Sequence, residues 1–150
     1  MRHLIFTFVD HFEPRTPEQL AAWTDGYPRA VERFPDADGR CPQHSWFYAE
    51  ADFHVLQGLG GLCRKKFGEI EVHLHHAYDT ADGLRETLEA RKKRYAEFGA
   101  LVTSGPGPSP AFGFIHGKWS LDNSRGDAHC GVNNELTVLR EAGCYADFTF

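Results

Sequence analysis

Apolar residues recur along the chain with two periods, the two-residue period of a β-strand and the roughly 3.6-residue period of an α-helix. Residues 69–75 show the first period most clearly, because Glu and His take every second position and aliphatic residues take the positions between. Residues 80–98 show the second, with Thr80 as the capping residue and Gly99 as the C-terminal stop. The two patterns together predict a strand followed by a helix.

The remaining segments extend this alternation into a series of βα units. Strands are expected at residues 3–9, 43–48, 69–75, 111–116 and 145–150. Helices are expected at residues 16–34, 53–63, 80–98 and 134–142. Pro28 is expected to kink the first helix, and three prolines make residues 105–110 a loop. This order predicts an α/β fold of parallel strands alternating with helices, either a small open doubly wound sheet or the first part of a larger barrel.

The composition narrows the class of protein but does not indicate which reaction or ligand it serves. With 41% hydrophobic residues, the 150-residue chain can bury one globular core, so one domain is expected over residues 1–150. Mixed charges with a net charge of −5 give no basic surface for nucleic acid or an anionic membrane. No apolar run approaches about 18 residues, and no cleavage site follows the first strand, so neither a membrane span nor a signal peptide is expected. The four cysteines form no Cys-x-x-Cys pair and are expected as reduced thiols of a cytoplasmic protein.

The third strand carries the most specific chemical signal. His73 and His75 are two residues apart, so their side chains point to the same face of the strand as Glu69 and Glu71. A strand buried between helices is usually apolar on both faces, so a polar face indicates a wet or metal-filled interior. Two neutral imidazoles can reach one divalent ion of the zinc, iron or nickel type. The alternative is that both histidines simply satisfy hydrogen bonds at the end of the strand.

Residues at the end of the first strand strengthen the prediction of a metal. Asp10 and His11 follow that strand, and a carboxylate combined with imidazoles is common in hydrolytic metal sites. We therefore expect Asp10, His11, His73 and His75 as metal ligands, although Asp10 alone would ordinarily cap a helix or a turn. His76 points to the opposite face, where a structural hydrogen bond is the expected role.

Three segments of the chain resemble the polysaccharide deacetylase superfamily, that is, carbohydrate esterase family 4 and its relatives. They are residues 7–14 (TFVDHFEP), 69–76 (EIEVHLHH) and 116–124 (HGKWSLDNS). The resemblance implies a distorted (β/α)7-type barrel that binds a divalent metal, most often zinc. The implied activity is that of an enzyme that removes N- or O-acetyl groups from a carbohydrate. It also implies that Asp10 is the general base or a ligand and that His73 is a ligand. His11 stands where the family has a second Asp and Ala77 where it has a second His, which leaves His75 or Asp79 as the replacement ligand.

Roles for other residues follow from that reaction. Asp10 would take the proton of the attacking water, so Asp10→Asn is expected to abolish hydrolysis, with Glu13 as the next candidate base. His116 would protonate the leaving group. Substrate contacts are expected from residues at the strand ends, and these are Glu13, Trp119, Asp122 and Asn123. The alternative for Trp119 is a place in the core.

Two other functions fit the same pattern of histidines. His-x-His at a strand end also occurs in amidohydrolase-like and phosphoesterase-like barrels, although usually on the first strand and here on the third. A catalytically silent fragment that binds a glycan or a protein partner is the third interpretation. Metal content together with acetate release separates the first function from both alternatives.

The number of strands leads to an expectation about assembly. A barrel of this type needs roughly 200–250 residues and seven or eight strands, whereas five strand patterns are present here. An unpaired edge strand at residues 145–150 would be open to association. We therefore expect a partial barrel, either a truncated gene product or one that pairs its open edge with another copy. Light scattering tests this expectation, and a stable, soluble monomer with a cooperative melt would contradict it.

Overall fold

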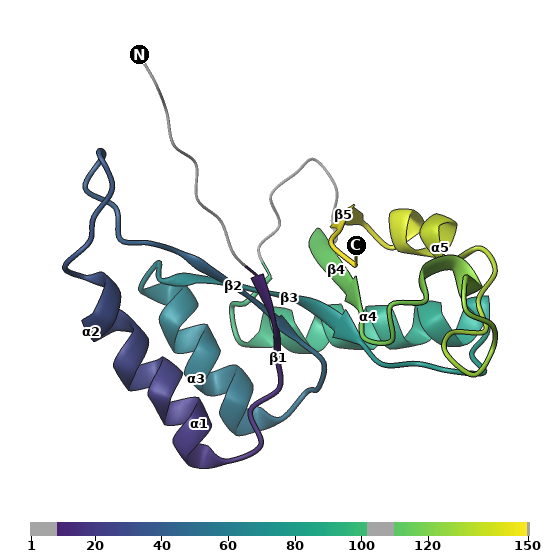
Figure 1. Cartoon of the computed structure of the whole chain (residues 1–150), viewed down its shortest axis with the longest axis horizontal. Helices are drawn as coiled ribbons and strands as arrows, with labels where there is room; N and C mark the ends of the chain where they lie inside the picture. Colours follow the sequence, from purple (N-terminus) through teal and green to yellow (C-terminus); the bar gives the residue numbers. More distant parts are fainter. Residues whose placement is uncertain (1–8, 102–109, 150) are drawn as a thin grey trace.

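The chain folds into one parallel five-stranded sheet whose strands follow one another in chain order (Figure 1). A computed structural model describes residues 9–101 and 110–149. The strands are β1 (Val9–Phe12), β2 (His44–Tyr48), β3 (Gly68–Leu74), β4 (Phe112–His116) and β5 (Cys144–Asp147). The predicted α/β class with parallel strands is therefore confirmed. Most of the predicted first strand, residues 3–8, and most of the predicted loop at residues 105–110 lie outside the described residues.

Helical segments connect the strands close to the positions that the sequence predicts. They are α1 (Pro17–Ala21), η1 (Ala22–Gly26), α2 (Tyr27–Val31), α3 (Phe53–Arg64), α4 (Ala81–Glu97), η2 (Leu121–Asn123) and α5 (Glu135–Glu141). Thr16 accepts a hydrogen bond from the Gln19 amide and Thr80 accepts one from the Gly83 amide, so both predicted caps form. The predicted kink before Pro28 takes the form of a π-helical turn at η1.

The helices pack on one face of the sheet. Alternate strand residues, including Phe12, Trp46, Val72 and Phe114, join the buried apolar residues of α3, α4 and α5 in a single core. A doubly wound sheet would reverse its strand order and place helices on both faces. The strands instead follow one another without a reversal, and within the described residues β1 and β5 stand at the two edges, so the sheet is open there and no barrel is closed.

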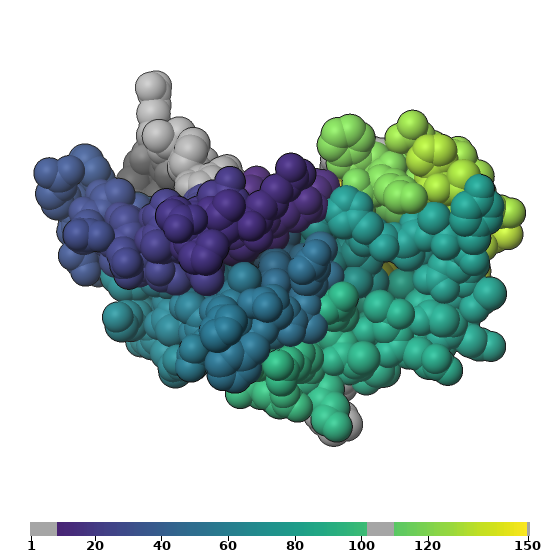
Figure 2. All heavy atoms as spheres, turned by 90° about the horizontal axis from the view of Figure 1, so that it is seen from below, coloured from purple at the N-terminus to yellow at the C-terminus, as the bar shows by residue number. Residues whose placement is uncertain are grey.

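Glycines in α3 allow this helix to pack closely against its neighbours. A Cβ atom at Gly58 would lie 2.9 Å from Thr24 Cγ2, and one at Gly60 would lie 2.6 Å from the carbonyl oxygen of Phe98. Figure 2 shows the purple segment of β1 and α1 running along the blue-green segment that contains α3. The Gly-rich part of α3 thus packs directly against η1 on one side and against the end of α4 on the other.

The second face of the sheet, which we call the inner face, carries no helix among the described residues. Phe47 and Ile115 are buried there, and the Phe148 ring packs against Phe47 with the ring centroids 5.5 Å apart. Glu71 accepts hydrogen bonds from the Gly113 amide and the Tyr145 hydroxyl. The segment around β5 thus covers the middle of the inner face and leaves His11 and His75 exposed at the carboxyl ends of the strands. Within the described residues, no helix is long and apolar enough to cross a membrane.

Tyr95 ties α4 to the end of β2 and provides a test of the fold. Its buried hydroxyl donates to the carbonyl oxygens of Tyr48, at 2.5 Å, and Glu50, at 3.1 Å. Tyr95→Phe should lower the free energy of unfolding by about 1–2 kcal/mol, because it leaves buried carbonyls without their donor. Urea denaturation measures this loss. Tyr78→Phe is the control, since that side chain is 76% exposed, and an equal loss in both variants would contradict the assigned contact.

Candidate metal centre

A cluster of imidazoles and one carboxylate lies on the inner face at the carboxyl ends of β1 and β3. We call His11, Glu13, His73 and His75 the inner cluster. Glu13 Oε1 lies 3.1 Å from His73 Nε2 and 2.7 Å from His75 Nε2. The ring centroids of His11 and His73 are 4.4 Å apart. Donor atoms of His11, Glu13 and His73 all lie within 4.8 Å of one another, so these three residues could hold a metal ion.

The hydrogen bonding of His73 determines which of its nitrogens faces this cluster. Nδ1 lies 2.9 Å from the carbonyl oxygen of Ile115, and since a carbonyl only accepts, Nδ1 carries the proton. Burial lowers the pKa of His73, so the ring is neutral and Nε2 presents a lone pair. Histidines that bind metals commonly donate their other N–H to a carbonyl in this way.

The lone pair of His73 faces a second electron donor. The hydrogen bond from His75 is the main reason that the pKa of Glu13 is lowered, so this carboxylate is ionised at neutral pH. Glu13 Oε1 and His73 Nε2 are thus two donor atoms directed at each other 3.1 Å apart, and a cation between them would bind both. The inner cluster therefore has the donor arrangement of a cation site.

A second group of donors, which we call the buried cluster, lies on the helix side of the sheet. It contains His76, His116, Cys130 and Glu135, and their donor atoms also lie within 4.8 Å of one another. His76 Nε2 is 2.9 Å from Glu135 Oε1, in agreement with the hydrogen-bonding role expected for His76. The buried cluster is likewise a group that could hold a metal ion.

The structure does not bring Asp10 to either cluster. Asp10 points to the helix side of the sheet, where its Oδ1 lies 3.1 Å from His44 Nε2. The reason is strand alternation: β1 continues to Phe12, so Asp10 and His11 face opposite sides. Of the four expected metal ligands, His11 and His73 lie close enough to Glu13 for the three residues to hold one ion. His75 contacts Glu13 Oε1, the oxygen that His73 also contacts.

His116 lies in the buried cluster and away from the inner face. Burial lowers the pKa of His116 to about 4, so the ring is neutral at pH 7 and lacks the additional proton that a general acid would transfer. The expected role of His116 as proton donor therefore has no support in this arrangement.

The three expected substrate-binding residues after β4 take different positions. Trp119 is 56% exposed, and its ring lies edge-on to the His11 ring at a centroid distance of 6.3 Å, so it borders the inner cluster. Asp122 caps the Leu136 amide, and Asn123 bonds Asp127, Asn133 and the Gly131 amide. Asp122 and Asn123 thus support the loop itself.

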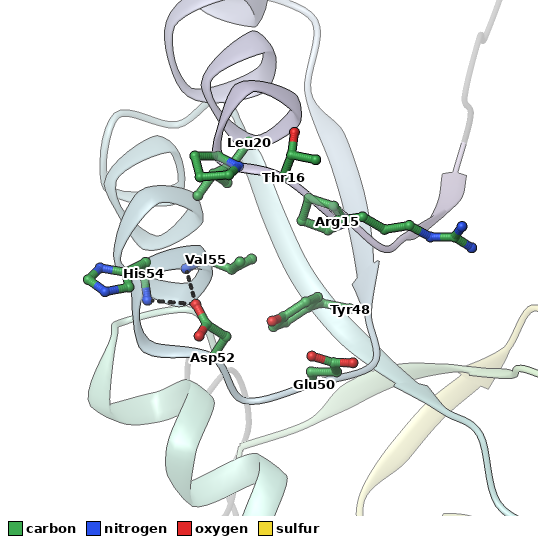
Figure 3. A pocket seen from close by; sticks show the side chains of 10 residues that line it. Arg15, Thr16, Leu20, Tyr48, Glu50, Asp52, His54 and Val55 are labelled. Atoms are coloured by element: carbon green, nitrogen blue, oxygen red, sulfur yellow. Dashed lines mark hydrogen bonds between the residues drawn. The ribbon is translucent and has the colours of Figure 1, made fainter.

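Cavities adjoin the inner cluster at the ends of β1 and β2. A cavity of about 160 Å³ is lined by Glu13, His75, Tyr48 and Glu50 among others. A larger one of about 620 Å³ shares Tyr48 and Glu50 and extends towards α1 and α3. Figure 3 shows both of these shared side chains directed into the larger cavity, while Asp52 turns away to cap the first amides of α3. The two cavities are thus neighbours, and the smaller one borders the inner cluster at Glu13 and His75.

No known protein family, no curated protein and no solved structure matches this chain. The fold and the clusters define the class on their own: a parallel α/β protein with histidine-rich groups, at the carboxyl ends of its strands, that could hold a metal ion.

A matched pair of substitutions on β1 and the turn after it tests the inner cluster. Glu13→Gln and Asp10→Asn both replace a carboxylate by an amide, but only Glu13 faces His73. Loss of a group that supports a metal ligand without binding the metal weakens metal affinity by roughly 10–100-fold. Glu13 is itself an expected ligand, so Glu13→Gln should weaken zinc binding by more than this. Asp10→Asn should bind zinc as the unmodified protein does. Competition with a chromophoric chelator measures both affinities, and the reverse ranking would place the site at Asp10.

Proposed function

We propose that the chain is a metal-dependent hydrolase that removes acetyl groups from a carbohydrate, with the reaction at the inner cluster. The observation that carries this proposal is the set of donors from His11, Glu13 and His73, in which the lone pair of His73 is aimed at Glu13. Two imidazoles and one carboxylate are a ligand set of catalytic zinc sites, which keep a position open for water or substrate.

The surroundings of the inner cluster support chemistry on a bound ligand. Glu13 is 40% exposed and His75 is 44% exposed, so solvent and substrate can reach the donors, whereas His73 is fully buried. A divalent ion held here would polarise an acetyl carbonyl and lower the pKa of a bound water towards about 7. The inner cluster thus combines a rigid buried ligand with an accessible side.

His75 is the residue that we assign to proton transfer. Its Nε2 lies 2.7 Å from Glu13 Oε1, beside the place that an ion would take. An imidazole nitrogen there would accept the proton of the attacking water and return it to the departing sugar oxygen or nitrogen. A Cβ atom at Gly117 would lie 2.5 Å from His75 Nδ1, so only glycine leaves room for the ring in this position.

Two features favour a sugar as the substrate. Trp119 presents an exposed indole ring beside His11, and an aromatic face can stack on the apolar face of a sugar ring. The cavities beside the inner cluster offer the Tyr48 ring and the Glu50 carboxylate. The resemblance of residues 7–14, 69–76 and 116–124 to polysaccharide deacetylases points to the acetyl group as the part that is cleaved.

Acetate release is the experiment that tests this function. The zinc-loaded protein is incubated with N-acetylated chitin oligosaccharides and with O-acetylated xylan oligosaccharides, and free acetate is measured. We expect release from one of the two, and loss of that release in Glu13→Gln but not in Asp10→Asn. Zinc binding at the inner cluster without acetate from either substrate would overturn the proposed reaction and favour a binding role.

His75→Gln separates proton transfer from metal binding. The variant should retain zinc, because His11, Glu13 and His73 remain, yet kcat should fall by roughly 10²–10⁴-fold as expected for loss of a general base. Trp119→Ala serves as the comparison and should raise KM more than it lowers kcat. A His75→Gln protein with kcat close to that of the unmodified protein would show that another group accepts the proton.

A further inference from the structure

The buried cluster joins four chain segments that are far apart in the sequence. His76 follows β3, His116 ends β4, Cys130 lies in the long connection after β4, and Glu135 begins α5. The side chains of His116 and Glu135 are fully buried, Cys130 is a fully buried residue, and the side chain of His76 is 11% exposed. Solvent therefore has almost no access to these donors, in contrast to the inner cluster.

The spacing of the donors matches a small tetrahedral ion. Zinc bonds of about 2.0–2.3 Å place two tetrahedral ligands roughly 3.3–3.7 Å apart. Glu135 Oε1 lies 2.9 Å from His76 Nε2 and 3.9 Å from His116 Nε2, and Glu135 Oε2 lies 3.3 Å from Cys130 Sγ. The two distances from Oε1 lie on either side of the tetrahedral value, and ligand atoms of all four residues lie within 4.8 Å of one another, so side-chain adjustments would bring them to one ion.

An unsatisfied nitrogen supplies an independent indication of a ligand. His116 Nε2 is buried and aimed into the buried cluster, but it has no hydrogen-bond partner among the described residues. Buried polar atoms without a partner are rare in folded proteins. A cation would satisfy Nε2 once the ring proton has moved to Nδ1.

We propose that His76, His116, Cys130 and Glu135 bind a structural zinc-type ion, separate from the inner cluster. Thiolate and imidazole donors favour zinc over magnesium or calcium, which take oxygen ligands. Four protein ligands leave no open position, which is the mark of a structural zinc site as opposed to a catalytic one.

Binding of the ion changes two protons. The Cys130 thiol loses its proton to solvent as the sulfur–metal bond forms. His116 Nδ1 accepts the Lys118 amide, so the neutral ring holds its proton on Nε2, and this proton must move to Nδ1 when Nε2 binds the ion. The Lys118 hydrogen bond is then lost, which is a small cost beside the binding of a zinc ion by four ligands.

The connection between β4 and α5 gives the ion a structural role. Over residues 117–134 the only helical or strand segment is the short turn η2. Trp119, Asp122 and Asn123 all have positive φ angles, of 49°, 54° and 59°, which are strained for residues other than glycine. An ion bound by the buried cluster would tie the far end of this connection to β3 and β4. It would thereby hold the segment that carries Trp119 beside the inner cluster.

Cobalt substitution tests this proposal, because only a site with a cysteine gives a thiolate-to-cobalt charge-transfer band in the near ultraviolet. The protein loaded with cobalt should show the band. Cys130→Ser should abolish it, and Cys41→Ser, which changes a cysteine outside the buried cluster, should retain it. Cobalt bound to the unmodified protein without this band, or a band that survives in Cys130→Ser, would overturn the proposal.

Two further measurements distinguish binding at the buried cluster from binding at the inner cluster, and loss of binding from loss of the fold. Glu13→Gln should retain the band while it loses the ion of the inner cluster, so each site can fail without the other. Because Cys130 is buried, it reacts only when the protein opens locally, so alkylation is followed over an incubation long enough to label Cys130 in the metal-free protein. Zinc should slow this labelling, as mapped by mass spectrometry, and this measurement requires no variant. Labelling of Cys130 at the same rate with and without zinc would contradict the site.

Discussion

The alternation of side chains across a sheet that carries its helices on one face is the constraint on which the rest of this structure depends. Phe12, Trp46, Val72 and Phe114 point to the helices and form the core. Residues of the opposite parity must point to the inner face, where the described residues place no helix. Polar groups such as His73 can be accommodated on that face. Strand geometry therefore separates the apolar core on one face from the candidate metal ligands on the other.

The sequence predicted the elements well, because their signals are local. Caps at Thr16 and Thr80 and the alternation in residues 69–75 act within a few residues, and the structure contains the corresponding helices and strand. Pairing of His73 with His75 on one face was predicted from the same alternation.

Asp10 was predicted to lie with His73 and His75 at one metal site, because the first strand was expected to end at residue 9. β1 continues to Phe12, so alternation also governs Asp10 and His11 and turns them to opposite faces. The same alternation directs Glu13 with His11, a signal that was available in the sequence. Cys130 and Glu135 gave no such signal, because they reach His76 and His116 only through the path of a long connection.

The two clusters differ in access, and this difference separates their proposed roles. The inner cluster has exposed donors beside cavities, whereas the buried cluster is closed and lies at the base of the segment that carries Trp119. An open ligand set suits hydrolysis, and a closed one suits support of that segment. His73 provides the rigid element of the open set through its bond to the carbonyl of Ile115.

Anomalous diffraction at the zinc edge, from crystals of the zinc-loaded protein, tests the central claim most directly. The account predicts a peak on the inner face within about 2.0–2.2 Å of His73 Nε2, a ring nitrogen of His11 and a carboxylate oxygen of Glu13. The Nδ1 atom of His73 should still donate to the carbonyl of Ile115. A crystal saturated with zinc that shows no peak at this position, with His73 still bonded to Glu13, would contradict it.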